Sequence, residues 1–154
     1  MTLLLEPIPA ETDPDRFAAE LAPAFRGDEG PAREMLAQTV ALLTKDPRPA
    51  PWGSYLARLE GQAVGICAFK SAPDAAGEAE LAYMTFPAFE GRGHAGEMIA
   101  MLAAIADEAG VLPIAHTLPE ENASNRALKR NGFVFAGEVE DPEDGLVWRW
   151  ERRR

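Results

Sequence analysis

Three glycines between a strand-like segment and a helix-forming segment restrict the fold of this chain more than any other feature. Gly91, Gly93 and Gly96 follow residues 79–86, which have the composition of a strand. Apolar residues then recur at helical spacing: Met98, Met101, Leu102 and Ile105. A strand that turns into a helix through glycines presents consecutive backbone N–H groups at the helix N-terminus, where they can bind an anion such as phosphate. The alternative interpretation is a tight strand-to-helix turn without a ligand.

The same glycines satisfy G-x-G-x-x-G, the fingerprint of dinucleotide-binding folds. Such a fold needs several βαβ units. The segments before the glycines instead alternate as an antiparallel meander would, and only 58 of the 154 residues follow Gly96. A nucleotide-dependent oxidoreductase therefore stays an alternative that tight binding of NAD(H) would establish.

The rest of the chain predicts short strands and helices joined by turns. Strands are expected at 3–8, 55–59, 63–69, 79–86, 111–116, 133–139 and 146–150, and helices within 13–28, from Pro31 to before Pro47, from the glycines to Gly110, and over 124–131. Because a helix separates 79–86 from 111–116, these two strands should be parallel. We see no repeats, so the chain is expected to be one domain over residues 1–154.

Composition excludes several classes of function. The formal net charge of −10 argues against a nucleic-acid or anionic-membrane surface, and it favours cationic partners. No apolar run approaches the ~20 residues of a membrane span, and the first residues lack the basic region of a signal peptide. The single cysteine, Cys67, cannot form an internal disulfide, which favours a reducing cytoplasm. Two separated histidines and one cysteine do not make a ligand set, so no metal is expected.

Two motifs give the chain a recognisable resemblance. Residues 80–95 and 124–133, read in order, resemble the acetyl-CoA loop and the later helix-to-strand motif of the GNAT superfamily of N-acetyltransferases. Gly93 and Ala95 fill the last two defined positions of the loop pattern Q/R-x-x-G-x-G/A. Glu90 stands where the family usually has Gln or Arg, and a carboxylate there should point away from a bound pyrophosphate. The resemblance covers roughly residues 50 to 152 and is closest to the branch that acetylates the N-termini of ribosomal proteins.

This resemblance implies an α/β fold with a mixed, mainly antiparallel sheet of about seven strands flanked by about four helices. It implies that strands 79–86 and 111–116 separate and that acetyl-CoA enters between them as co-substrate. The cofactor-binding residues that it implies are Tyr83, Met84, Thr85, Gly91, Arg92, Gly93, His94, Ala95, Gly96, Asn122, Asn125 and Lys129. The backbone from Tyr83 to Thr85 would pair with the pantetheine arm, and the glycine loop would bind the pyrophosphate.

Three side chains are candidates for proton transfer. Glu80 lies in a strand that is otherwise nearly apolar and resembles the strand glutamate that is the general base in some GNAT enzymes; alternatively, it is solvated or paired with an arginine. His116 ends the following strand and is either a base or a structural histidine. Ser124 matches a serine proposed to protonate the leaving thiolate, but it also suits a helix N-cap. Other branches use a tyrosine one turn later, where this chain has Leu128.

The resemblance therefore implies transfer of an acetyl group from acetyl-CoA to a primary amine by direct attack, without a covalent enzyme intermediate. A non-catalytic acyl-CoA-binding module is the alternative, because it would keep the loop without a working base. The amine acceptor, either a small molecule or a peptide, is not identified by the sequence, and a homodimer is compatible with it. No nucleic acid and no membrane are expected as partners.

Overall fold

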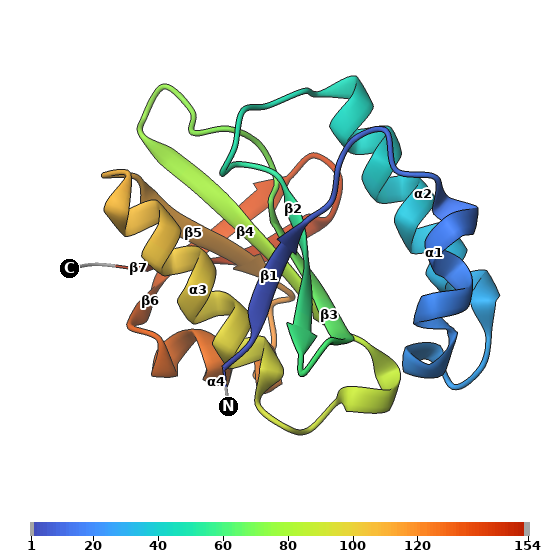
Figure 1. Ribbon diagram of the computed structural model, residues 1–154. Coiled ribbons are helices and arrows are strands. Elements are labelled where there is room, and N and C mark those ends of the chain that lie inside the picture. The colour runs from blue at the N-terminus through green and yellow to red at the C-terminus, as the bar shows by residue number, and fades with distance from the viewer. Residues whose placement is uncertain (1, 153–154) are drawn as a thin grey trace.

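The fold is built on one sheet whose strands are not in chain order (Figure 1). The computed structural model describes residues 2–152, apart from the side chain of Arg16. Within this range seven strands lie in the order β1-β2-β3-β4-β5-β7-β6. The strands are β1 (Leu4–Pro7), β2 (Ser54–Leu59), β3 (Gln62–Phe69), β4 (Glu78–Thr85), β5 (Leu112–Thr117), β6 (Phe133–Asp141) and β7 (Gly145–Arg152). The helices are α1 (Pro14–Leu21), α2 (Glu29–Lys45), α3 (His94–Glu108) and α4 (Ala123–Arg130), with 3-10 turns η1 (Ala22–Phe25) and η2 (Pro87–Phe89).

This architecture confirms the expected mixed, largely antiparallel sheet with seven strands and four helices among the described residues. The expected elements are all present, with ends that differ by a few residues. The closing hairpin is longer than predicted, because β6 continues to Asp141 and β7 begins at Gly145. No helix in the described range is long and apolar enough to cross a membrane.

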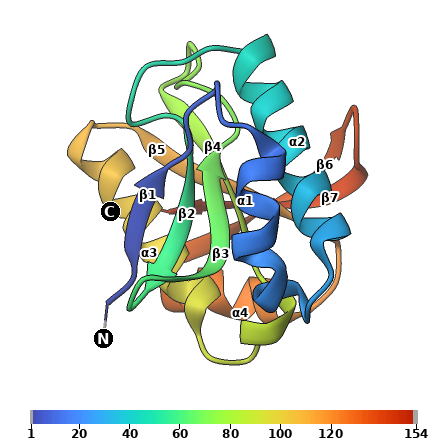
Figure 2. The same ribbon diagram turned by 45° about the vertical axis from the view of Figure 1, so that its right-hand side comes forward.

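Different helices cover the two faces of the sheet (Figures 1 and 2). Helices α3 and α4 pack on one face, where Leu102 and Leu128 are fully buried. Helices α1 and α2 pack on the other face, where Leu21 and Leu36 are buried against Leu56 of β2. We call these the α3/α4 face and the α1/α2 face. Two separate apolar clusters therefore stabilise the sheet from its two sides, which is the layered arrangement that an α/β sheet requires.

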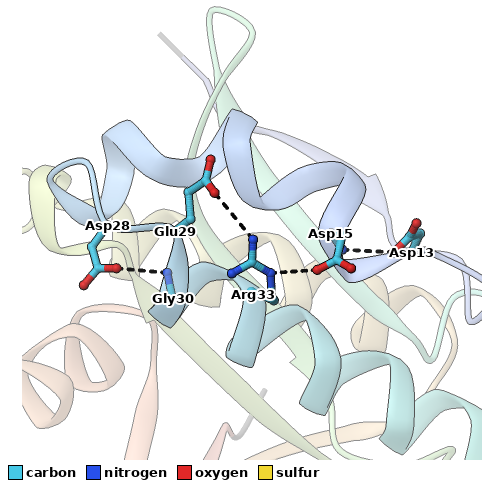
Figure 3. A network of polar contacts seen from close by, with 6 residues as sticks. All are labelled: Asp13, Asp15, Asp28, Glu29, Gly30 and Arg33. Carbon is cyan, nitrogen blue, oxygen red and sulfur yellow. Dashed lines mark hydrogen bonds and ion pairs between the residues drawn. The ribbon is translucent and has the colours of Figure 1, made fainter.

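Arg33 of α2 joins the two helices of the α1/α2 face (Figure 3). Its Nε atom donates a 2.7 Å hydrogen bond to Asp15 of α1, and its Nη2 atom lies 3.4 Å from Glu29 one turn earlier in α2. Asp13 and Asp28 cap the two helices by accepting backbone N–H groups of the first turn. Exposed ion pairs contribute only ~0–1 kcal/mol each. These contacts therefore fix the orientation of α1 against α2, while burial of the apolar side chains supplies most of the stability.

Strand β4 changes its neighbours along its length. It pairs antiparallel with β3 from Leu81 to Thr85, and it pairs with β5 in the predicted parallel direction. The parallel ladder joins only residues 78–80 to residues 112–114, after which β5 continues against β7 as far as Thr117. Among the described residues, the edge of β4 that faces β5 thus has no strand partner from Leu81 to Thr85. Backbone N–H and C=O groups along that edge are available to a ligand.

Gly65 of β3 lies where a side chain cannot be accommodated. A Cβ atom at this position would stand 2.7 Å from the carbonyl oxygen of Met84 and 2.9 Å from the terminal methyl carbon of Met98. Both distances are shorter than a van der Waals contact. Glycine is therefore needed for β3 to pack closely against the end of β4 and against α3, and this packing fixes the strand end at which the site is built.

Candidate active site

Glu80 of β4 forms a cluster with one residue from each side of its strand: Lys70, next to β3, and His116 on β5. The Nζ atom of Lys70, which follows β3, lies 3.1 Å from Glu80 Oε2, and Nδ1 of His116 on β5 lies 3.3 Å from Oε1. The His116 contact is not aligned as a hydrogen bond. Both Glu80 and His116 are mostly buried, whereas Lys70 is nearly half exposed. Glu80 and His116, the two candidate bases predicted separately from the sequence, therefore lie in one cluster. The neighbours of Glu80 are a lysine and a histidine, and not the arginine that the sequence offered as an alternative.

Acidic residues of the turn between β6 and β7 extend this cluster. Burial lowers the pKa of the Lys70 ammonium group, but attraction to Glu80 and a hydrogen bond with it, together with attraction to Asp144 and Asp141, raise that pKa overall. The pKa of the exposed Asp141 carboxyl is lowered, first because the backbone N–H groups of Asp144 and Glu143 donate to it and also because Lys70 and His116 are near. Lys70 therefore remains a cation that this acidic group of side chains surrounds.

Tyr83 and Ser124 form a second pair, three residues along β4 from Glu80. The phenol oxygen of Tyr83 and Oγ of Ser124 lie 2.6 Å apart, and either hydroxyl can be the donor. Burial raises the pKa of the Tyr83 phenol, although the hydrogen bond with Ser124 acts in the opposite direction. This pair connects β4 to the first turn of α4 across the edge where β4 has no strand partner. Sequence reasoning identified both residues but not their contact.

The two pairs lie on opposite faces of the sheet. Side chains alternate along a strand, so Glu80 and Tyr83 point in opposite directions. Tyr83 packs against the apolar cluster of the α3/α4 face. Ala82 and Met84, which share the orientation of Glu80, line a cavity of about 250 Å³ beneath α2. The Glu80 cluster therefore lies on the α1/α2 face beside this cavity, while the two hydroxyls lie on the α3/α4 face.

The N-cap of α4 is Asn122, which answers the question that the sequence left open for Ser124. The Asn122 side chain accepts the N–H of Asn125, and the Asn125 side chain accepts the N–H of Asn122, which together make a capping box. Asn125 is fully buried and also donates to Thr117 Oγ1 at 2.9 Å. Ser124 is therefore not the cap, and its hydroxyl group is directed to Tyr83 instead. The predicted contacts of Asn122 and Asn125 with the cofactor stay predictions.

The glycine loop begins α3 in the expected way. Gly93 is the N-cap residue with φ +82°, and Gly91 has φ +78°, both in the left-handed region that favours glycine. The first N–H groups of a helix, here those of His94, Ala95 and Gly96, have no partner within the helix. His94 is buried, and neither of its ring nitrogens has a hydrogen-bond partner among the described residues. The loop therefore offers several donors and one imidazole without an internal acceptor.

A bound anion fits this loop. A Cβ atom at Gly91 or Gly93 would meet no atom within 4 Å, so the space outside both glycines is open to a ligand. The free N–H groups and the helix dipole favour negative charge at this position. Glu90 is exposed at the start of the loop. These observations match what the phosphates of acetyl-CoA require.

The basic residues predicted to contact the cofactor lie at the edges of this region. Arg92 is exposed, and its guanidinium carbon lies 5.6 Å from the ring centroid of Phe89. Lys129 of α4 is half exposed, with Nζ 3.5 Å from Glu121 and 5.8 Å from the centroid of the Trp150 ring. The structure does not bring these two side chains together. Their roles toward the cofactor stay predictions.

Asn131 is a residue of this region that sequence reasoning missed. Its Nδ2 atom donates to the carbonyl oxygens of Gly96 at 3.2 Å and of Ala127 at 2.9 Å. It thereby ties the end of α4 to the first turn of α3. The only signal in the sequence is that Asn131 precedes the left-handed Gly132 at a helix end, which indicates a helix C-terminus and not a link to another helix.

The two tryptophans of β7, Trp148 and Trp150, lie on one sheet face because they are two residues apart on the strand. Trp150 is buried in the core, and its Nε1 atom donates to Thr117 Oγ1 at 3.0 Å. Trp148 is partly buried, and both indoles contact the ring of Phe135. They belong to the α3/α4 face and so lie away from the Glu80 cluster. In the described part of the chain, no three His, Cys, Asp or Glu side chains are placed to hold a metal ion.

Comparison with known proteins identifies the family. The family model of the acetyltransferase (GNAT) domain matches residues 2–134, so the chain belongs to this family. The expected class is thereby confirmed: the chain is a GNAT acetyltransferase with the fold of that family. The described residues form a sheet with one parallel pair of strands, β4 with β5, and not the several βαβ units of a dinucleotide-binding fold. No curated protein sequence matches the chain.

Solved structures share the fold at low sequence identity. The acetyltransferase from Salmonella typhimurium that modifies the N-terminal serine of a 50S ribosomal protein has a TM-score of 0.70 and 17% identity, with 100% of this chain and 96% of that one covered. RimL, a ribosomal-protein alpha-N-acetyltransferase in complex with coenzyme A, has a TM-score of 0.70 and 16% identity, with 99% and 94% covered. AAC(6')-Ib in complex with ribostamycin and coenzyme A has a TM-score of 0.71 and 15% identity, with 100% and 94% covered.

Proposed function

We propose that this protein transfers the acetyl group of acetyl-CoA to a cationic primary amine, with the amine approaching from the α1/α2 face. One observation carries the proposal: a carboxylate–imidazole cluster and a pair of hydroxyls lie on opposite faces of β4, beside the edge that has no strand partner. Amine acetylation needs a proton acceptor on the amine side and a proton donor on the thiol side. The arrangement supplies one of each on opposite sides of the same strand.

The donor side is assigned to the glycine loop and to the free edge of β4. The first turn of α3 and the loop from Gly91 to Gly96 would bind the pyrophosphate, with His94 as an additional contact. The backbone from Tyr83 to Thr85 would pair with the pantetheine arm, and Asn122 would contact the same arm from α4. The solved structures of similar fold that contain coenzyme A support this assignment.

The reaction balances without a covalent enzyme intermediate. The neutral amine nitrogen attacks the thioester carbonyl carbon, a C–N bond forms, and the C–S bond breaks with its electron pair going to sulfur. The amine loses a proton and the departing thiolate gains one. Backbone N–H groups on the free edge of β4 would stabilise the negative charge that develops on the carbonyl oxygen. No metal is required by these steps.

Glu80 is the group that we assign as proton acceptor. It is mostly buried at the end of the β4–β5 ladder, and its Oε1 atom faces His116. The Nζ atom of Lys70 pairs with the other carboxylate oxygen, Oε2. A substrate amine or a bridging water would therefore contact Oε1, on the side of the carboxylate that faces His116. His116 lies close enough to take over the proton or to accept it directly.

The preference for a cationic acceptor follows from the charge around this cluster. The formal net charge of the chain is −10. Asp141 at the end of β6 and Asp144 in the following turn lie near Lys70, and Glu143 is in the same turn. A negative field raises the local concentration of cations and speeds their encounter. The cavity beneath α2, lined by Met35, Leu42 and Met84 among others, would accept an apolar part of the same acceptor.

The test is a screen for release of the CoA thiol from acetyl-CoA in the presence of amino acids, polyamines, aminoglycosides and N-terminal peptides. We expect turnover of a cationic amine, with the product heavier by one acetyl group. Binding of acetyl-CoA without turnover of any amine would instead support the non-catalytic module. Binding of NAD(H) without binding of CoA would contradict the proposal altogether.

A further inference from the structure

Tyr83 and Ser124 share a hydrogen bond that links two segments far apart in the sequence. Their oxygens lie 2.6 Å apart, at the short end of the range for O–H···O bonds. The bond crosses from β4 to α4 at the edge where pantetheine is proposed to lie. Both hydroxyls are therefore close to the position at which the C–S bond would break.

The helix itself does not require this contact. Asn122 and Asn125 already satisfy the capping box of α4, so a Ser124 hydroxyl group is not needed to begin the helix. The core does not require it either, because a phenylalanine ring would fill the same apolar site as the tyrosine ring. A part-buried pair of hydroxyls that neither packing nor capping explains is a candidate for chemistry.

The two hydroxyls differ in acidity. An ordinary phenol titrates near ~10 and a thiol near ~8.5, whereas an alkyl hydroxyl does not titrate in water. Ser124 alone is thus a poor proton donor to a thiolate, but a phenol hydrogen-bonded to it brings the donor much closer to the thiol in acidity. Burial raises the pKa of the Tyr83 phenol, so it stays protonated through neutral pH.

We propose that Tyr83 and Ser124 act as one proton donor to the leaving thiolate, with Tyr83 supplying the proton and Ser124 passing it on. As the C–S bond breaks, the Ser124 proton goes to sulfur and the Tyr83 proton goes to Ser124 Oγ. The phenolate then regains a proton from water after the thiol has left. This role rests on the proposed acetyl transfer. The position one turn after Ser124, where other branches have a tyrosine, is Leu128 in this chain, so here the phenol is supplied by Tyr83 of strand β4.

Three variants test the pair: Tyr83→Phe, Ser124→Ala and the double variant. Each single change is expected to lower kcat roughly 10- to 100-fold, with the KM for acetyl-CoA changed less than about 3-fold. The double variant is expected to lose no more than the worse single variant, because the two groups act as a unit. A purely structural bridge would instead lower thermal stability and leave kcat within about 2-fold of the wild type.

Fluorinated tyrosines at position 83 separate chemistry from structure. They keep the ring and the hydroxyl group but lower the phenol pKa by steps. If the phenol donates the proton, the alkaline limb of the pH profile of kcat moves to lower pH in the same order. A bridge that only holds α4 against β4 would leave that limb where it is.

Tyr55 provides the matched control. It is the other of the two tyrosines in the chain, it is buried, and its hydroxyl group donates to the Pro51 carbonyl oxygen at 2.6 Å. Tyr55→Phe is expected to keep the wild-type kcat. If the wild type is active and Tyr83→Phe has the same kcat, the proposed role of Tyr83 is wrong and the proposed function stands. If the wild type turns over no amine, the proposed function itself is wrong.

Discussion

The side-chain amide of Asn131, at the end of α4, donates a hydrogen bond to the carbonyl oxygen of Gly96 in the first turn of α3. The same amide also donates to Ala127 within its own helix. One side chain therefore sets the distance between the helix that begins at the glycine loop and the helix that carries Ser124. Under the proposed mechanism, donor binding and proton donation both depend on this distance, although Asn131 itself is hydrogen-bonded only to Gly96 and Ala127 among these residues.

Asn131→Ala is expected to weaken acetyl-CoA binding several-fold and to lower the free energy of unfolding by ~1–3 kcal/mol, since two part-buried carbonyl groups lose their donor. Calorimetric titration and denaturant unfolding measure the two effects. Thr39→Val, which removes a part-buried hydroxyl donor to Met35 in α2, is the control and should affect stability only. Unchanged affinity in Asn131→Ala would show that the link has no part in donor binding.

Gly93→Val is expected to abolish acetyl-CoA binding, because a branched side chain would fill the open space outside the loop where the pyrophosphate is proposed to lie. The left-handed backbone at Gly93 adds a strain of ~1–2 kcal/mol for any residue with a Cβ. Gly110→Val carries the same strain at φ +73°, also in open space, but at the far end of α3. Calorimetry should show normal affinity in Gly110→Val, and equal affinities in the two folded variants would contradict the assignment of the loop.

Glu80→Gln is expected to lower kcat roughly 10²-fold at neutral pH and to move the basic limb of the rate profile to higher pH, since solvent must then deprotonate the amine. Steady-state kinetics across pH with the best amine from the screen measures both. Glu78→Gln is the matched control, because Glu78 lies two residues away on β4 and is paired with Arg149 at 2.7 Å. An unaltered pH profile in Glu80→Gln would remove Glu80 from the mechanism and assign the proton to His116.

For the best cationic acceptor, kcat/KM is expected to fall as ionic strength rises from ~0.05 to ~0.5 M, because salt screens the field of the acidic turn. Asp144→Asn should reduce both the low-salt value of kcat/KM and its salt dependence. Glu108→Gln removes the same charge at the end of α3, away from the turn, and should change neither. A neutral acceptor with a rate that does not depend on salt would refute the charge argument.

Cys67 is expected not to react with thiol reagents in the folded protein at pH 8. Burial raises the pKa of this thiol to about 12, so the reactive thiolate is scarce as well as inaccessible. Because the folded-state pKa lies above the ordinary value of 9.0, the thiol stabilises the folded state fully below that value, and the contribution is lost as pH rises toward 12. Reagent titration before and after unfolding measures reactivity, and denaturation of Cys67→Ala at high pH isolates the stability effect.

Much of the fold could be predicted because it depends on local patterns. The apolar run from Ala63 to Phe69 indicates a strand by its short length and by the turn residues before it, and the stripe after Gly96 indicates a helix by its periodicity. The parallel pairing of β4 and β5 follows from the helix between them. The ends were less accurate, since the length of the β6–β7 hairpin depends on cross-strand pairs such as Glu140 with Leu146, which a single sequence does not reveal.

The candidate site was predictable as a set of residues but not as a set of contacts. Glu80 and Ser124 were identified by their place in the two motifs, and His116 by its position at the end of a predicted strand. The contact of Lys70 with Glu80 depends on the antiparallel register, and the contact of Tyr83 with Ser124 joins residues 41 positions apart. The sequence left open whether Ser124 caps α4, and only the backbone at the start of the helix shows that Asn122 is the cap. Long-range geometry was therefore the missing information.

The separation of the two faces of β4 has a consequence for how specificity can diverge in proteins built this way. In the proposed function, the donor is bound by α3, α4 and the glycine loop, whereas the surface beside Glu80 is formed by α2, the cavity beneath it and the turn between β6 and β7. Since the sheet lies between them, substitutions that reshape one side leave the packing of the other side largely intact. A chain of this type can exchange its acceptor while keeping its donor, and the α1/α2 pair is the natural segment to transplant when a new acceptor is sought.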